Sequence, residues 1–136
     1  MKTIRKNYPQ RSSAISKCHL GVGVDIEYID RFRMLNKVRH RSFLKMIFTK
    51  KEQSYCFSRK DPAPHLAARF CAKEAIVKAL GSMGIHKVAY SKIEIVKNAK
   101  GVPQVIFHIK GKKFQIQISI SHARDYAIAC AVILQK

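Results

Sequence analysis

The stretch LAARFCAKEAIVKALG, at Leu66–Gly81, decides the fold of this 136-residue chain. Its apolar side chains recur at helical spacing, so it predicts a helix. Asp61 is the predicted N-cap and Pro62 the first helical residue. Gly81 and Gly84 predict where the helix ends, because glycine is the residue that most often stops one.

Strands are predicted on both sides of this helix. Residues 19–26 form a short strand whose glycines permit close approach of another backbone. Nearer the C-terminus, apolar and polar residues alternate as in half-buried strands, over residues 93–95, 105–109 and 116–120. A continuous apolar run, 126–134, predicts a buried strand. The pattern predicts one α+β domain over residues 19–136, with helices packed on one face of a mainly antiparallel sheet.

Two shorter helices are predicted between the first strand and the long helix. Phe32, Leu35 and Val38 recur at helical spacing from about Tyr28 onward. A second helix is predicted to begin at Thr49, because Glu52 three residues later completes a capping box.

The charge of the chain predicts an anionic partner. It has 27 Lys and Arg against 8 Asp and Glu, a formal net charge of +19. On charge alone, the partner is a nucleic acid, a phosphorylated small molecule, an acidic protein or an anionic membrane. No segment approaches the roughly 18 apolar residues of a membrane span. Residues 1–18 are rich in basic residues and have no acid, which predicts a flexible basic leader.

The cysteines predict a reducing compartment. None of the four forms a Cys-x-x-Cys pair or has a histidine at zinc-finger spacing. Cys71 and Cys130 lie among apolar residues and are predicted to be core thiols. We therefore expect a cytosolic protein, although an even number of cysteines is also compatible with disulfides.

Two carboxylates stand where acids are scarce, Asp25 at the end of an apolar strand and Glu74 inside the long helix. Mg²⁺ usually takes one or two carboxylates together with phosphate oxygens and water. The pair could supply that share. The alternative is that Asp25 begins a helix and Glu74 pairs with Lys78, four residues later on the same side. The residues by themselves favour this alternative.

A polar segment, ISISHARDYA at 118–127, ends one predicted strand and begins the next. His122 and Arg124 could bind phosphate oxygens, Arg124 through its planar guanidinium. A Ser-His-Asp hydrolase is the weaker interpretation, because no nucleophile-elbow glycines accompany Ser119 or Ser121.

Residues 31–51 contain eight Lys and Arg and no acid after Arg31, and could dock an acidic protein surface. Nucleic acid is the alternative partner for this run. However, the sequence has no zinc finger and no aromatic RNA-binding strand.

Three segments in this order resemble the holo-acyl-carrier-protein synthase family, the small bacterial type of 4′-phosphopantetheinyl transferase. They are GVGVDI at 21–26, LAARFCAKEAIVKALG at 66–81 and ISISHARDYA at 118–127. The resemblance extends over about residues 20–134. It differs at Gly101-Val-Pro103, where the family usually has Gly-Lys-Pro, and at Ala123, where Thr or Ser is usual.

The resemblance implies that coenzyme A gives its phosphopantetheine arm to a serine of an apo acyl carrier protein, releasing 3′,5′-ADP. It implies a cytoplasmic enzyme of fatty acid biosynthesis. Asp25 and Glu74 match the family's magnesium-binding acids, and Lys78 matches the lysine near the transferred phosphate. Glu74 and Lys78 are the implied catalytic residues. The general base is either Glu74 or a metal-bound water.

Further residues match the family's binding surfaces. Arg69 and His122, with Lys78, match residues near the coenzyme's phosphates. The family is typically a trimer with sites at subunit interfaces. The basic residues implied to dock the acidic carrier protein are Arg31, Arg33 and Arg41.

Two other functions remain as alternatives. One is a basic nucleic-acid-binding domain without catalysis. The other is a protein of the same fold that acts as an inactive scaffold for carrier proteins.

Overall fold

The computed structural model describes residues 19–136, and the predicted leader at 1–18 lies outside the described residues. A three-stranded antiparallel sheet has the order β1-β5-β4. Its strands are β1 (Leu20–Tyr28), β4 (Phe114–Ala123) and β5 (Tyr126–Gln135). A separate antiparallel pair is formed by β2 (Ile93–Lys97) and β3 (Pro103–Phe107).

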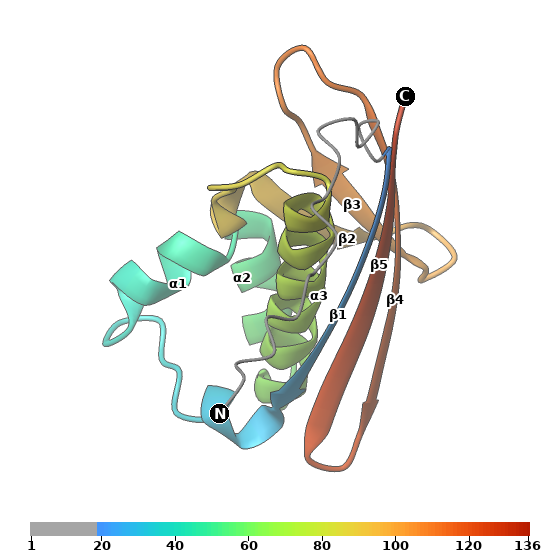
Figure 1. The fold of residues 1–136 in the computed structure, drawn as a ribbon. Coiled ribbons are helices and arrows are strands. Elements are labelled where there is room, and N and C mark those ends of the chain that lie inside the picture. The colour runs from blue at the N-terminus through green and yellow to red at the C-terminus, as the bar shows by residue number, and fades with distance from the viewer. Residues whose placement is uncertain (1–18) are drawn as a thin grey trace, which may run out of the picture.

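The helices lie on one side of the three-stranded sheet (Figure 1). The long helix α3 (Ala63–Ser82) packs on the sheet, and α1 (Arg41–Ile47) and α2 (Lys50–Phe57) lie on the side of α3 away from it. The predicted α+β fold, with helices on one face of antiparallel strands, is confirmed. Among residues 19–136, no helix is both long enough and apolar enough to cross a membrane.

Two glycines of β1 bring this strand against α3. A Cβ added at Gly23 would lie 1.9 Å from the carbonyl oxygen of Ala75, and one added at Gly21 would lie 2.3 Å from that of Ala79. No side chain fits at either position, because backbone oxygens of the helix occupy the space. This contact brings the residues at the end of β1 next to α3.

The predicted helix through Val38 is wrong. A 3₁₀ turn, η1 (Ile29–Phe32), is followed by turns, and the first α-helix begins only at Arg41. The Oδ1 of Asn36 accepts hydrogen bonds from the backbone N–H groups of Val38 at 2.8 Å and Arg39 at 3.3 Å. Such local bonds compete with helix formation.

Other predicted boundaries hold to within a few residues. Thr49 and Glu52 form the predicted capping box of α2. Asp61 Oδ1 accepts from the N–H of Ala63 at 3.2 Å, although the helix begins one residue later than predicted. Gly81 lies inside α3, whereas Gly84 follows its end with a φ of 79°.

The buried strand predicted over residues 126–134 forms as β5, but only one of its faces is buried. Its residues alternate between buried and exposed, and Cys130 is exposed rather than a core thiol. β1 shows the same alternation. The apolar side chains exposed on this outer sheet face are Leu20, Val22, Val24, Ile26, Ile128, Val132 and Leu134. We call this surface, together with Cys130, the outer sheet face. In the described residues it has no helix over it.

Candidate active site

Asp25 lies in the middle of β1, not at the start of a helix, so that alternative is wrong. Its Oδ1 accepts an ion-pair hydrogen bond from the Nζ of Lys78 at 2.8 Å. Lys78 also donates to the carbonyl oxygen of Val24 at 3.1 Å. The Oδ2 of Asp25 is buried and has no hydrogen-bond partner among the described residues. A buried carboxylate oxygen without a partner is costly, so this atom is suited to bind a cation or a donor.

Glu74 does not pair with Lys78, as the alternative interpretation had suggested. Its Oε1 instead accepts a hydrogen bond of 2.6 Å from the hydroxyl of Tyr90, which precedes β2 in the 3₁₀ turn η2 (Tyr90–Lys92). Burial, and then this hydrogen bond to a carboxylate, raise the pKa of Tyr90. The hydroxyl therefore remains a donor at neutral pH. No signal in the sequence pointed to this contact.

The charged side chains around Asp25 and Lys78 affect one another's pKa values. The bond to Asp25 raises the pKa of Lys78, which stays a cation, and Glu74 adds to the effect. Burial raises the pKa of the Glu27 carboxyl; Arg31 opposes this, and the charges of Asp25 and Glu74 reinforce it. The negative charges of Asp25 and Glu74 thus both act on Glu27, and such a gathering of negative charge favours the binding of a cation nearby.

Cys71 also touches Asp25 but is no candidate nucleophile. Its Sγ donates to the carbonyl oxygen of Asp25 at 2.9 Å. Burial, and then the charge of Asp25, raise the pKa of this thiol to about 12. A thiol that stays protonated is a poor nucleophile. Chemistry at this site therefore depends on the carboxylates and Lys78.

The donor set fits Mg²⁺ with a phosphorylated substrate. Within residues 19–136, no group of three or more His, Cys, Asp or Glu side chains is arranged to hold a metal by itself. Mg²⁺ does not need such a group, because it usually binds one or two carboxylates and takes its other ligands from phosphates and water. The unpartnered Oδ2 of Asp25 and the nearby carboxylate of Glu74 meet this requirement.

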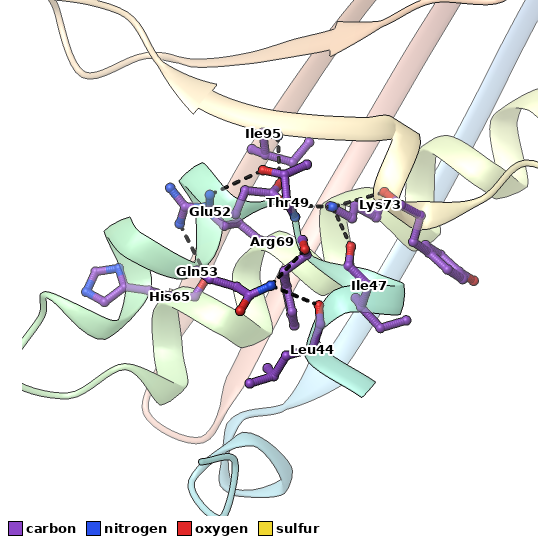
Figure 2. Close-up of polar contacts among 11 residues, drawn as sticks. Leu44, Ile47, Thr49, Glu52, Gln53, His65, Arg69, Lys73 and Ile95 are labelled. Atoms are coloured by element: carbon purple, nitrogen blue, oxygen red, sulfur yellow. Dashed lines mark hydrogen bonds and ion pairs between the residues drawn. The ribbon is translucent and has the colours of Figure 1, made fainter. Parts of the chain in front are cut away.

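A buried ion pair between Lys73 and Glu52 involves the residue that precedes Glu74 on α3 (Figure 2). The Nζ of Lys73, which precedes Glu74, lies 2.7 Å from Glu52 Oε2. It also donates to the carbonyl oxygens of Ile47 at 2.6 Å and Tyr90 at 3.0 Å. Burial lowers the pKa of Lys73, and Glu52 opposes this. Lys73 belongs to the family-like segment, but its role was not predicted from the sequence.

Arg69 and His122 lie at a second, cationic cavity of about 230 Å³. His65 and Lys97 also line it, and no acidic residue does so among the described residues. The cavity is smaller than the 300–1,000 Å³ typical of whole-ligand pockets. It can therefore hold only part of a large molecule, and its charge favours an anionic part.

Arg69 is held in a fixed position in this cavity. It is 5% exposed, its Nε has no partner among the described residues, and an Nη donates to the carbonyl oxygen of His65 at 3.3 Å. Its guanidinium lies 4.1 Å from the ring centre of Tyr55, and that of Arg59 lies 4.2 Å from it. Burial, and then Arg69, Arg59 and Lys97, lower the pKa of His65. The positive charges gathered around this cavity favour the binding of an anion.

The two groups of predicted residues lie on different flanks of α3. Asp25 and Lys78 meet at β1, whereas the cavity of Arg69 includes His122 from β4, at the opposite edge of the sheet. Five residues separate Arg69 from Glu74, which corresponds to about 140° around the helix axis. One chain therefore brings Lys78 to the predicted acids but leaves Arg69 and His122, the other predicted phosphate-binding residues, at a different place.

The hydrolase interpretation has no support in the structure. His122 continues the series of Ile116, Ile118 and Ile120, which faces the core. Ser119 and Ser121 alternate with that series, so they lie on the opposite face of the sheet. A serine and a histidine on opposite faces do not form a catalytic pair.

The predicted docking residues differ in their partners. Arg31 pairs with Glu27 at 2.6 Å. Arg33 bridges Asp30 at 2.6 Å and Asp61 at 2.7 Å, which ties η1 to the start of α3. Arg41 forms no ion pair with any residue of the 19–136 region.

Sequence reasoning missed several residues of these sites. His65 could have been found, because it lies four residues before Arg69 on the same helix face. Tyr55, Arg59 and Lys97 come from other elements, and no local pattern connects them with Arg69. Tyr90 was missed for the same reason.

Comparison with known proteins identifies the family to which the chain belongs. The profile of the 4′-phosphopantetheinyl transferase superfamily matches residues 21–131. Holo-[acyl-carrier-protein] synthase from Protochlamydia amoebophila is 45% identical over 83% of this chain and 96% of its own length. That from Chlorobaculum parvum is 41% identical over 82% and 96%. An ACPS–CoA complex from Chronobacterium ammoniagenes superimposes with a TM-score of 0.71 at 26% identity, over 86% of this chain and 98% of its own. The chain belongs to the 4′-phosphopantetheinyl transferase superfamily, in its holo-acyl-carrier-protein synthase family.

Proposed function

We propose that this chain transfers the phosphopantetheine arm of coenzyme A to a serine of an apo acyl carrier protein, assisted by Mg²⁺. The serine oxygen forms a bond to the phosphorus of the arm, the bond from that phosphorus to the bridging oxygen breaks, and 3′,5′-ADP leaves. One observation carries the proposal: the buried Oδ2 of Asp25 has no hydrogen-bond partner among the described residues. This carboxylate lies close to Lys78 and Glu74, in a chain whose net charge is +19.

Asp25 and Glu74 are the proposed holders of the ion. When bound, Mg²⁺ neutralises charge on the pyrophosphate oxygens. Lys78 is half exposed, with its side chain 52% accessible, and stays cationic because Asp25 raises its pKa. It can therefore bind an oxygen of the transferred phosphate and stabilise the charge that develops there. The serine proton goes to Glu74 or to water.

Arg69 and His122 are proposed to bind phosphate of the nucleotide end of coenzyme A. Their cavity is cationic and holds only part of a ligand, so the rest of the coenzyme extends outside it. Charge-assisted hydrogen bonds from a guanidinium to a phosphate are stronger than neutral ones. The unpartnered Nε of Arg69 gives the phosphate a donor that no described residue uses.

The proposed working form is a homotrimer with sites shared between copies. The outer sheet face leaves a row of apolar side chains uncovered, from Ile26 at 60% exposed to Val132 at 41%. A second copy is the proposed cover, because burying such a surface is favourable. Sharing also explains why Glu74 and Arg69 lie on different flanks of α3: one copy supplies the acids and its neighbour the phosphate-binding residues.

A mixing experiment tests the shared site. Glu74→Gln and Arg69→Gln variants, each inactive alone, are combined under conditions that let subunits exchange. If sites are shared, some mixed assemblies contain a site with both native residues, and activity returns. If each site lies within one copy, no mixture regains activity, and the shared arrangement is overturned. Light scattering on the native protein gives the assembly size.

The carrier protein is proposed to dock on the basic segment that contains Arg31, Arg33 and Arg41. Of these, Arg41 has its charge least compensated within the described residues, because the other two form ion pairs. The proposed place of the reaction is fatty acid biosynthesis in the cytoplasm.

The transfer is tested by mass spectrometry of an apo acyl carrier protein incubated with this protein, coenzyme A and Mg²⁺. The expected result is a gain of one phosphopantetheine arm, which disappears when a chelator is added and returns with excess Mg²⁺. A gain that persists in chelator overturns the role of the metal. No gain with several carrier proteins overturns the transfer itself.

A further inference from the structure

Tyr90 connects the buried centre of the molecule to Glu74. Its hydroxyl donates to Glu74 Oε1 at 2.6 Å, and its backbone oxygen accepts from Lys73 Nζ at 3.0 Å. Because Lys73 and Glu74 are neighbours on α3, this tyrosine spans two consecutive helical residues. Tyr90 is the only hydrogen-bond partner of the Glu74 side chain within the 19–136 region.

The position of Tyr90 is fixed from three sides. Lys73 is held by the buried carboxylate of Glu52, whose other oxygen accepts from the N–H of Ile95 at 2.8 Å. The same buried carboxylate therefore fixes the start of β2, just after the turn that carries Tyr90. The ring of Tyr90 stacks on that of Phe70, with centres 6.0 Å apart and planes at 26°. A hydroxyl held in this way is a rigid donor.

We infer that Tyr90 is a positioning residue, which orients the Glu74 carboxylate for a divalent cation; this rests on the proposed role of Glu74. A glutamate on a helix surface otherwise samples several rotamers and loses that freedom when it binds a metal. The Tyr90 hydroxyl occupies Oε1 and leaves Oε2 to face the ion. It adds no charge, so it orients the ligand without competing for it.

The chain offers a conservative variant and a matched control. Tyr90→Phe removes the hydroxyl and keeps the ring that stacks on Phe70. Tyr28→Phe also removes a hydroxyl bonded to a carboxylate, that of Asp30 at 3.3 Å, but this hydroxyl is exposed and makes no bond to Glu74. Hydrogen-bond partners of metal ligands typically change metal affinity by 10- to 100-fold.

The test is a double-mutant cycle on Mn²⁺ affinity, measured by electron paramagnetic resonance on the coenzyme A-bound protein. The four proteins are the native chain, Tyr90→Phe, Glu74→Gln and the double variant. We expect Tyr90→Phe to weaken Mn²⁺ binding about tenfold in the native background and to have no effect in the Glu74→Gln background. Tyr28→Phe is expected to match the native protein.

In steady-state assays, the Mg²⁺ concentration for half-maximal rate should rise by the same factor, with the KM for coenzyme A unchanged. If Glu74→Gln loses Mn²⁺ affinity but Tyr90→Phe does not, the positioning role alone is overturned. Equal losses from Tyr90→Phe in both backgrounds overturn it too, because the residue then acts without Glu74. If Glu74→Gln binds Mn²⁺ like the native protein, the metal assignment fails, and the inference fails with it. Thermal melting shows whether Tyr90→Phe remains folded.

Discussion

The ammonium of Lys73 lies 2.7 Å from Glu52 Oε2, and their side chains are 0% and 1% exposed. All three donors of Lys73 are used, because it also bonds to the carbonyl oxygens of Ile47 and Tyr90. Glu52 is equally occupied: it accepts from the N–H groups of Thr49 and Ile95. The pair thus connects α2, α3 and the start of β2 at one buried point.

Removal of one member of this pair should destabilise the protein strongly. Lys73→Met leaves the Glu52 carboxylate buried without its cation, which is expected to cost about 3–5 kcal/mol of unfolding free energy. The Glu52→Gln/Lys73→Met double variant should be more stable than Lys73→Met, because no buried charge remains. Lys51→Met, which breaks an exposed pair with Glu94, should change stability by less than about 0.5 kcal/mol. Denaturant unfolding measures all three, and equal stabilities of the Lys73 and Lys51 variants would contradict the assignment.

The close contact between β1 and α3 gives a second prediction. Gly23→Ala places a methyl group against the carbonyl oxygen of Ala75, so strand and helix must separate. We expect a loss of at least about 1–3 kcal/mol, together with reduced transfer activity, since Asp25 lies on the same strand. Gly81→Ala is the control. Its added methyl meets nothing within 4 Å inside a helix, and it should stabilise by about 0.5–1 kcal/mol. Thermal melting that ranks the two variants in the reverse order would refute this packing argument.

Neutralising Glu74 should abolish transfer while the fold persists. Glu74→Gln keeps the size of the side chain and removes one charge from the proposed cation site, so we expect transfer to fall by at least about 100-fold. Melting temperature and assembly size should be unchanged. Glu94→Gln serves as the control for loss of one acid elsewhere. Near-native turnover of Glu74→Gln at ordinary Mg²⁺ concentrations would remove Glu74 from the active site.

The pH behaviour of His65 gives a test of the cationic cavity. Burial and the charges of Arg69, Arg59 and Lys97 hold the pKa of His65 below the usual 6.5. As the pH falls, the imidazole is therefore protonated in the unfolded chain before it is protonated in the folded protein. The contribution of His65 to stability is therefore fully present above about pH 6.5 and is lost progressively as the pH falls from that value through the lower pKa of the folded protein. A phosphate in the cavity should favour the imidazolium and raise the pKa of His65. NMR titration with 3′,5′-ADP measures the shift, and adenosine, which has no phosphate, is the control. An unchanged titration would place the phosphate elsewhere.

The docking surface can be separated from the coenzyme site by charge reversal. Arg41→Glu should weaken binding of the acidic carrier protein several-fold without changing coenzyme A affinity or stability, because Arg41 has no ion pair within residues 19–136. Arg33→Glu should also lower stability, because it puts a third acid beside Asp30 and Asp61. Calorimetric titrations with each ligand separate these effects. Equal losses of carrier-protein and coenzyme affinity in Arg41→Glu would argue against a separate docking surface.

Local patterns in the sequence were sufficient for most of the fold. The capping box of Thr49 and Glu52 and the alternation over Ile116–Ile120 depend only on neighbours in the chain, and both are confirmed. The helix predicted through Val38 failed because Asn36 bonds to the following backbone N–H groups, and this local competition outweighs apolar spacing. The strand at 126–134 was predicted to be buried because its residues are apolar throughout. Composition alone does not reveal that a single chain covers only one face of this strand.

The sequence by itself determined the family, the helix that carries Glu74 and Lys78, and the strand that carries Asp25. Only the tertiary structure decided which charges meet. Lys78 pairs with Asp25, 53 residues earlier in the chain, rather than with its helical neighbour Glu74. Likewise, Tyr90 reaches Glu74 from another element. The physical reason is that helical spacing limits which side chains can be neighbours, whereas long-range packing, here the contact of Gly23 with Ala75, sets which partner comes within hydrogen-bonding distance.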